Sequence, residues 1–216
     1  GKKIILNSEI GDVLSKTGFD KKIIAQIAFG ESKFQYLNEI ISGSLSADMM
    51  DYLLRDGYFT GAEHANVDHK RITQSLHIHK KKIALERSAL YSFESMMHSR
   101  YQMFKAVYFH KTVRAAEVML IQALRLSDDE FGFSSFNLDE FVKLTDEFVL
   151  SSIISSKSSK LKRARQLTEN YQNRKLLKCV FERILTSQTN LKKTRTDELR
   201  LELSKKSKID ENEIFI

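Results

Sequence analysis

The chain has 216 residues, of which 42% are hydrophobic and 29% are charged, and its formal net charge is +7. This is the composition of a soluble globular protein, and no apolar run reaches the ~20 residues that cross a bilayer, which excludes a transmembrane helix and membrane partners. The single cysteine, Cys179, excludes an internal disulfide and indicates a reducing, cytoplasmic location.

Two further features of the composition bear on structure and partners. Proline is absent and there are eight glycines. Proline inside a helix destabilises it by ~3 kcal/mol, and glycine also disfavours helix. The scarcity of both residues therefore favours long helices. The excess of positive charge suits polyanionic partners, which range from phosphorylated small molecules to nucleic acid.

The first part of the chain predicts short helices. Apolar residues recur at helical spacing in residues 9–18, 20–30, 35–43 and 46–61. Asp20 and Ser46 are suitable N-cap residues, and Gly30 is a suitable stop. Around residues 75–86 the pattern changes to alternation, which predicts a short β-hairpin or an irregular excursion.

The middle of the chain predicts longer helices. Residues 88–126 show helical spacing over a span so long that a break near His110 is expected. A helix over residues 138–154 has Asn137 as its cap. After a polar stretch, a basic helix follows at residues 161–174.

The tail predicts a helix, a turn and a terminal strand at residues 213–216. A strand needs a partner, which residues 175–184 or the hairpin region would supply. The expected fold is therefore mainly α, with a helical body over residues 1–150, a small β element, and an α/β appendage over residues 151–216.

The segment SADMMDYLLRDGYFTG, residues 46–61, carries many charges for a helix that packs on a core. Asp48, Tyr52 and Asp56 are spaced by four and therefore share one flank, while Asp51 and Arg55 have the acid-first spacing of an ion pair. One interpretation is a solvated amphipathic helix. The other is a flank that holds a metal ion at one end and a hydroxylated ligand along its length.

This segment resembles the D-x-x-D-Y-x-x-R-D segment of the HD-domain phosphohydrolases, in the branch of the deoxynucleoside triphosphate triphosphohydrolases and their vertebrate relatives with a SAM domain. Three later stretches resemble the same branch: VDHKR at residues 67–71, MMHSRYQMFKAVYFHKTV at 96–113, and LTDEFVL at 144–150. The resemblance extends over residues 40–184 and implies a mostly helical HD-type domain.

The resemblance also implies site residues. Asp48 matches the family's distant metal-binding aspartate, for a divalent ion such as Mg, Mn or Fe. Tyr52 and Asp56 match residues that line the sugar of a nucleotide. Arg100 matches an arginine that contacts the triphosphate, and Tyr108 a tyrosine that opposes a 2′-hydroxyl. Water activated by the ion would attack phosphorus.

The family's other metal ligands, a histidine and an adjacent His-Asp pair, do not match. None of the six histidines precedes an aspartate; they are His64, His69, His77, His79, His98 and His110. We therefore expect the chain to be the C-terminal portion of a longer enzyme, without the N-terminal metal-ligand helices, with no catalytic residue of its own, no tightly bound ion and no hydrolase activity alone. Met49 replaces a lysine that meets the phosphates in the vertebrate enzymes.

Regulation of the family implies a further set of residues. Arg71, His110 and Lys111 match positions of nucleotide-dependent assembly, which also implies a homo-oligomer. Glu86, Ser88 and Ser92 stand where nucleotide-activated members carry basic side chains, so this kind of activation is not expected.

Two functions from different classes thus follow from the sequence. The first is part of a metal-dependent nucleotide phosphohydrolase, with a deoxynucleoside triphosphate as the expected substrate. The second is a non-catalytic helical module that binds protein or nucleic acid, for which the basic runs at residues 79–82, 157–165 and 191–195 would form the surface. Cys179, in an apolar run, is expected in the core.

Overall fold

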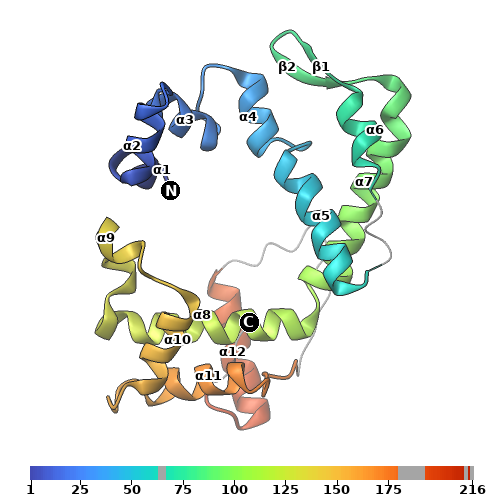
Figure 1. Ribbon diagram of the computed structural model, residues 1–216. Helices are drawn as coiled ribbons and strands as arrows, with labels where there is room; N and C mark the ends of the chain where they lie inside the picture. Colours follow the sequence, from blue (N-terminus) through green and yellow to red (C-terminus); the bar gives the residue numbers. More distant parts are fainter. Residues whose placement is uncertain (63–66, 180–192, 212–213, 215–216) are drawn as a thin grey trace. The chain divides into compact units, whose positions relative to one another are not determined.

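The computed structural model describes residues 1–62, 67–179, 193–211 and 214 (Figure 1). Over these residues the chain is mainly helical, and its sheet consists of two strands, which confirms the predicted fold class. None of the helices in this described part has the length and apolar content that a bilayer-spanning segment requires.

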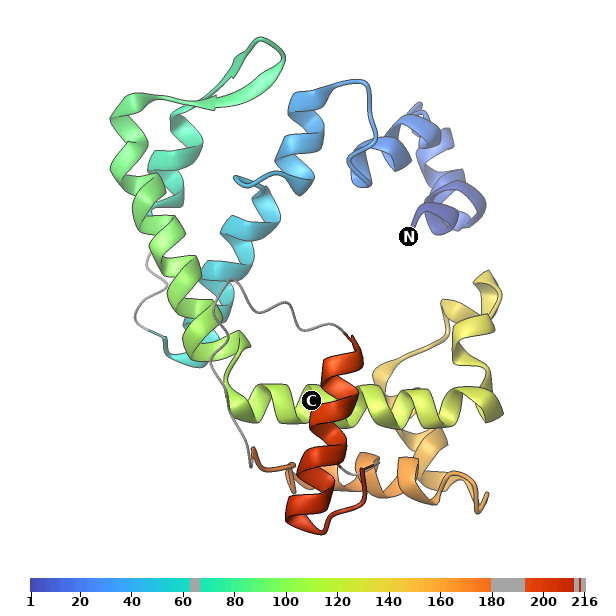
Figure 2. The same ribbon diagram turned by 180° about the vertical axis from the view of Figure 1, so that it is seen from behind.

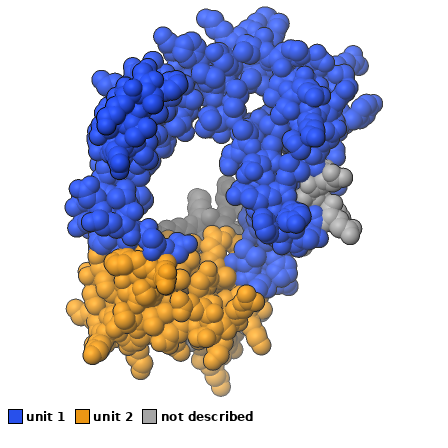
Figure 3. Space-filling model, viewed as in Figure 1, with its two compact units in different colours: residues 1–113, 132–146 blue, residues 114–131, 147–216 orange. Residues whose placement is uncertain are grey.

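The chain divides into two compact units, coloured in Figure 3. Unit 1 comprises residues 1–113 and 132–146, and unit 2 comprises residues 114–131 and 147–216. The domain boundary expected after residue 150 lies near the last change of unit. Residues 114–131, however, group with the C-terminal helices, because they contribute to the core of unit 2.

Unit 1 begins with short helices, and the two N-caps predicted among them, Asp20 and Ser46, are formed. Ser8, Asp20 and Ser46 accept hydrogen bonds from backbone N–H groups in the first turns of their helices. The helices in chain order are α1 (Lys2–Asn7), α2 (Glu9–Lys16), α3 (Lys21–Ala28), α4 (Gln35–Ser42), α5 (Ala47–Thr60), α6 (His69–Gln74), α7 (Leu90–Met103) and α9 (Leu138–Phe141).

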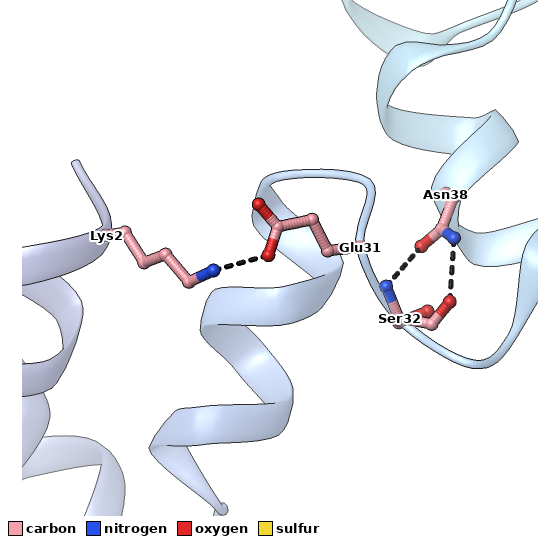
Figure 4. A network of polar contacts seen from close by, with 4 residues as sticks. All are labelled: Lys2, Glu31, Ser32 and Asn38. Atoms are coloured by element: carbon pink, nitrogen blue, oxygen red, sulfur yellow. Dashed lines mark hydrogen bonds and ion pairs between the residues drawn. The ribbon is translucent and has the colours of Figure 1, made fainter.

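A network of polar contacts connects the first of these helices (Figure 4). Lys2 at the start of α1 forms an ion pair with Glu31, which follows α3. Ser32, the residue after Glu31, makes two hydrogen bonds with Asn38 of α4. Asn38 Oδ1 accepts from the Ser32 N–H at 3.0 Å, and Asn38 Nδ2 donates to the Ser32 carbonyl at 2.8 Å. The loop between α3 and α4 is thereby tied to α1 and to α4.

Of the two structures expected around residues 75–86, the hairpin is the one formed. Strands β1 (Leu76–His79) and β2 (Lys82–Leu85) pair antiparallel, with Leu76 opposite Leu85. The two turn residues, Lys80 and Lys81, have φ values of 47° and 65°. Positive φ at both central positions is the conformation of a type I′ turn, which Asn and Gly usually occupy.

The core of unit 1 lies between α5, α6 and α7. Figures 1 and 2, from opposite sides, show α5 beside α7. The buried side chains of this core are Met49, Met50, Leu53, Val67, Ile72, Met96 and Met103. Gly61 ends α5 at a φ of 68°, a conformation that favours glycine although a Cβ there would meet nothing within 4 Å.

Two of the helices expected from the sequence are interrupted. The long span from residue 88 is broken as predicted: α7 passes into a π-helical turn, Phe104–Tyr108, and α8 (Lys111–Phe131) begins after it. The helix expected over residues 138–154 is split, which corrects that expectation. After the capping box of Asn137 and Glu140, the N–H of Leu144 bonds to the Phe141 carbonyl, which closes α9 with a tight turn.

Unit 2 contains α10 (Asp146–Ser155), α11 (Lys162–Gln172), α12 (Lys193–Ser207) and most of α8. Met119 and Ala123 of α8 pack on Leu167 of α11 to form its core. Cys179 is exposed, contrary to the expectation that it is a core residue, since Leu176 and Leu177 fill that place instead. The strand expected at residues 213–216 lies outside the described residues, apart from Ile214, which is not in a strand.

Candidate functional site

Helix α5 displays the predicted flank on unit 1. Its buried side carries Met49, Met50 and Leu53, so the residues between them turn outward. Tyr52 and Asp56 lie half-buried at the edge of the core, and Asp48, in the first turn, is exposed. The expected intrahelical pair is also formed, with Arg55 Nη2 3.0 Å from Asp51 Oδ2.

The second part of the site comes from the end of α7. Arg100, Phe104 and Tyr108 are spaced by four, a spacing that stacks side chains along one helical face. The backbone widens where this row ends: the Phe109 N–H bonds to the Phe104 carbonyl at 2.8 Å, the five-residue pattern of a π-helix. Such turns occur frequently at functional sites.

The two elements meet at a hydrogen bond between residues 52 positions apart. Tyr108 Oη donates to Asp56 Oδ2 at 2.7 Å. The Tyr52 ring stands edge-on to the Tyr108 ring, with centroids 6.1 Å apart and an interplanar angle of 73°. The structure therefore brings together a carboxylate and two phenols, three of the four side chains predicted to line a substrate.

Burial raises the pKa of Tyr108 above its ordinary value, and the hydrogen bond to Asp56 raises it further. The nearby negative charge of Asp56 acts in the same direction, because it disfavours a phenolate beside a carboxylate. The phenol therefore stays protonated at neutral pH and remains a hydrogen-bond donor.

Arg100 reaches this group through an aromatic residue that the sequence reasoning missed. Its guanidinium lies over the Phe104 ring, 5.6 Å from the centroid, and that ring packs edge-on against Tyr108 with centroids 5.1 Å apart. Arg100 and Tyr108 are eight residues apart, which places residue 104 midway between them on the same helical face. The position of Phe104, four residues from each of them, was the available sign that it supports the arginine.

Asp48 was assigned to a metal ion, and its surroundings test that fit. It is exposed, and within the described residues no three His, Cys, Asp or Glu side chains come together in a way that could hold an ion. The described residues alone therefore do not make a complete metal site. Asp48 as a ligand stays a prediction, which depends on ligands from elsewhere.

The residues matched to regulation lie on exposed parts of unit 1. Arg71 Nη2 donates to the Ser88 carbonyl at a long 3.4 Å. His110 Nδ1 accepts from the Thr112 N–H at 3.3 Å and so caps the start of α8, whose first residue is Lys111. The role of these residues at an interface stays a prediction.

Glu86, which stands where nucleotide-activated relatives are basic, already has partners. His77 Nε2 lies 2.7 Å from one carboxylate oxygen, and Ser88 Oγ donates to the other at 3.1 Å. These two hydrogen bonds, with that from His77 the larger influence, hold the pKa of Glu86 below its usual value. An ionised carboxylate here would repel a phosphate.

A cavity of about 240 Å³ lies beside this carboxylate, lined by Leu45, Leu85, Glu86, Arg87, Leu90 and Phe93. Its walls are mostly apolar, and none of the residues predicted to bind substrate lines it. It is therefore distinct from the group around Tyr108.

Comparison with known proteins places the chain in a family. Residues 67–216 match the family model described as the HD associated region. The chain belongs to the HD-associated-region family. This confirms the resemblance read from the sequence, and the matched region begins two residues before α6 and includes Arg100 and Tyr108.

Several relatives of this HD-associated-region chain are longer proteins. The uncharacterized protein YwfO of Bacillus subtilis is 31% identical over 165 residues, covering 68% of this chain and 38% of YwfO. The deoxynucleoside triphosphate triphosphohydrolase SAMHD1 homolog of Dictyostelium discoideum is 28% identical over 176 residues, covering 78% of this chain and 34% of that protein. The chain thus spans well under half the length of these relatives.

Solved structures agree with the fold. A hypothetical protein from Aquifex aeolicus has a TM-score of 0.72 at 29% identity, covering 93% of this chain and 53% of its own. A phosphohydrolase from Bacteroides thetaiotaomicron has a TM-score of 0.64 at 23% identity, covering 94% of this chain and 55% of its own. The likeness to the second structure concerns the fold alone.

Proposed function

We propose that the chain is the nucleotide-binding part of a metal-dependent HD-type phosphohydrolase whose substrate is a deoxynucleoside triphosphate. The observation that carries the proposal is the contact of Tyr108 with Asp56 and Tyr52, which joins two segments far apart in sequence. The names of the relatives from Dictyostelium and human, both deoxynucleoside triphosphate triphosphohydrolases, support the same substrate class.

The chemistry of the group suits a deoxynucleotide. Asp56 and the Tyr52 phenol can accept and donate hydrogen bonds to a sugar hydroxyl. The Tyr108 ring, fixed by Asp56 on one side and Phe104 on the other, would discriminate against a 2′-hydroxyl by excluding its volume. The Arg100 guanidinium, a planar donor fork, suits the phosphates.

The metal ion of this proposal would need ligands beyond the chain described here. Asp48 supplies one carboxylate, which suits a hard divalent cation, and the proposed longer protein supplies the rest. Because one carboxylate does not hold a catalytic ion, the 216-residue chain alone is expected to release no phosphate. Homo-oligomeric assembly and a cytoplasmic location stay predictions as well.

The metal assignment is tested in the longer protein with two neighbouring acids of α5. Asp48→Ala is expected to lower the bound metal and to abolish metal-dependent hydrolysis of deoxynucleoside triphosphates, measured by elemental analysis and product release. Asp51→Ala is the matched control, because Asp51 is also exposed and pairs with Arg55. Unchanged metal content in the Asp48→Ala protein would contradict the assignment.

Substrate discrimination is tested separately at Tyr108. Tyr108→Ala is expected to reduce the preference for a deoxynucleotide over the ribonucleotide by roughly tenfold or more, because the ring no longer occupies the space of a 2′-hydroxyl. The ratio of kcat/KM for the two substrates measures it. Tyr101→Ala, at an exposed tyrosine of α7, is the control. Equal ratios in all three proteins would remove Tyr108 from this role.

A further inference from the structure

The net charge of the protein is concentrated in one stretch of unit 2. Residues 157–178 contain eight lysines and arginines and a single acid, so that this segment carries a net charge of +7, equal to that of the whole chain. The remainder of the chain is formally neutral. A charge concentrated in this way attracts polyanions, whereas dispersed charge mainly serves solubility.

Six of these cations are exposed and have no ion-pair partner among the described residues. Lys157, Lys160, Lys162, Arg174, Lys175 and Lys178, called the α11 basic surface below, form no ion pair with any residue in the described part of the chain. Some cations elsewhere in the described part do form such pairs, as in Lys2–Glu31 and Lys206–Glu202. Within the described residues, the charges of the α11 basic surface are therefore not used in ion pairs of the chain itself.

The segment before α11 is fixed to the helix. The Arg165 guanidinium donates to the Ser156 carbonyl, and the Ser158 N–H bonds to Ser156 Oγ at 3.2 Å. These bonds fold residues 156–160 back onto the first turns of α11. Lys157 and Lys160 are consequently held beside the helix, which lowers the entropy lost when they bind an anion.

The segment after α11 is fixed as well. Arg174 adopts a φ of 55°, and the Lys175 N–H bonds to the Asn170 carbonyl at 2.8 Å, as in a Schellman motif. Leu176 and Leu177 then pack on the core of unit 2. The cations that follow α11 are thus anchored at a defined distance from Lys157 and Lys160, which precede it.

The spacing of the two ends suits a duplex. With 11 residues, α11 is about 16 Å long, and each strand of a nucleic acid duplex carries a phosphate every ~3.4 Å along the axis. The helix therefore matches about five base pairs. The segment's one aromatic residue, Tyr171, is half-buried against the core, so no exposed ring offers the stacking platform that single strands use.

We propose that the α11 basic surface binds the phosphate backbone of duplex nucleic acid, without sequence preference. Backbone contacts by lysine and arginine carry no base information, which accounts for the expected lack of sequence preference. This inference uses no residue of the Tyr108 group and stands or falls independently of the proposed hydrolase function.

The test measures binding of the full 216-residue chain to a labelled duplex of about 20 base pairs by fluorescence anisotropy, over a salt series. With four to six phosphates engaged, the slope of log K against log salt is expected to be about −4 to −5. The paired variants Lys157→Gln/Lys160→Gln and Lys175→Gln/Lys178→Gln should each flatten that slope by about 2. Circular dichroism checks that each variant is folded.

Two matched variants remove the same charge from unit 1. Lys16→Gln/Lys22→Gln, at exposed lysines of α2 and α3, should leave the slope unchanged. Lys80→Gln/Lys81→Gln removes the competing basic site in the hairpin turn and should also leave it unchanged. If Lys80→Gln/Lys81→Gln flattened the slope and the two α11 pairs did not, the proposal would be overturned.

Two further results would also overturn it. The first is tighter binding to a single strand of equal length than to the duplex. The second is binding to vesicles that contain phosphatidylserine, with no binding to the duplex, which would identify the α11 basic surface as a membrane contact. Equal affinity for duplexes of unrelated sequence, together with the two flattened slopes, would establish it.

Discussion

Tyr108 concentrates more of the site's contacts than any other residue described above. Its hydroxyl bonds to Asp56, its ring meets Tyr52, and its other side meets Phe104. A charge-assisted bond of this kind is stronger than one between neutral groups. The phenol therefore joins α5 to the end of α7 as well as shaping the proposed sugar site.

The variant Tyr108→Phe separates the hydroxyl from the ring. We expect it to lower the free energy of unfolding at pH 7 by about 1 kcal/mol, because the Asp56 carboxylate loses a donor while the ring contacts remain. Urea unfolding of the 216-residue chain measures this value. Tyr101→Phe, at an exposed phenol, is the control and should change nothing.

The same pair of proteins gives a pH test. The folded-state pKa of Tyr108 is raised, so its contribution to stability is complete below the unfolded pKa of about 10 and is lost as the pH rises through the folded value. The stability of the wild type should therefore fall more steeply above pH ~10 than that of Tyr108→Phe. Parallel curves would contradict the raised pKa.

Individual site residues could be predicted to different degrees. Spacing by four put Tyr52 and Asp56 on one flank, and the family resemblance added Arg100 and Tyr108. Phe104 was missed, since an aromatic residue in a helix is more often a core residue than the support of an arginine. The remaining ligands of Asp48 could not be predicted, because no pattern in this chain encodes them.

At the level of elements, the hairpin shows what an alternating pattern can and cannot give. Alternation around Ile78 and Ile83 predicted a hairpin or an irregular excursion, and the observed hairpin pairs these two residues. The turn could not be predicted from its residues, since Lys80 and Lys81 are not typical of a type I′ turn. Here the strand pairing imposes a conformation that the turn residues disfavour.

This conflict predicts a stabilising double substitution. Lys80→Asn/Lys81→Gly should raise the free energy of unfolding by about 1 kcal/mol, because asparagine and glycine adopt positive φ at lower cost. Urea unfolding and hydrogen exchange of the β1 and β2 amides measure it. Lys70→Asn/Lys82→Gly, outside the turn, is the comparison and should not stabilise. No gain from the turn variant would show that the turn is unstrained.

Helix ends show the balance between pattern and local bonding. Asp20, Ser46 and Asn137 were predicted as caps, and each accepts a backbone N–H. The split of the helix expected over residues 138–154 was not predicted, because apolar spacing continues across the tight turn that ends at Leu144. Periodicity reports which face is apolar and does not report where the hydrogen-bond ladder closes.

At the scale of the whole molecule, each unit has its own core. Met96 is fully buried in that of unit 1, and Met119 with Leu167 forms that of unit 2. The sequence did not predict that α8 belongs with the C-terminal helices. Such a grouping depends on contacts between residues such as Met119 and Leu167, which lie far apart along the chain.

The core of unit 1 gives a prediction about stability. Met96→Ala should lower the free energy of unfolding by about 2–5 kcal/mol, because it leaves a cavity among α5, α6 and α7. Met97→Ala, at a half-buried neighbour, should cost clearly less. Hydrogen exchange should show the loss of protection in α5 and α7. Equal effects of the two substitutions would contradict the assigned core.

The row of Arg100, Phe104 and Tyr108 has a consequence for how this gene can vary. Adding or removing one codon between residues 100 and 108 would rotate the phenol by about 100° relative to the guanidinium. Point changes in that stretch leave the angular relation intact, while a shift in length destroys it. Homologous genes that retain the pair should therefore tolerate length changes in the hairpin turn, but none across these nine positions.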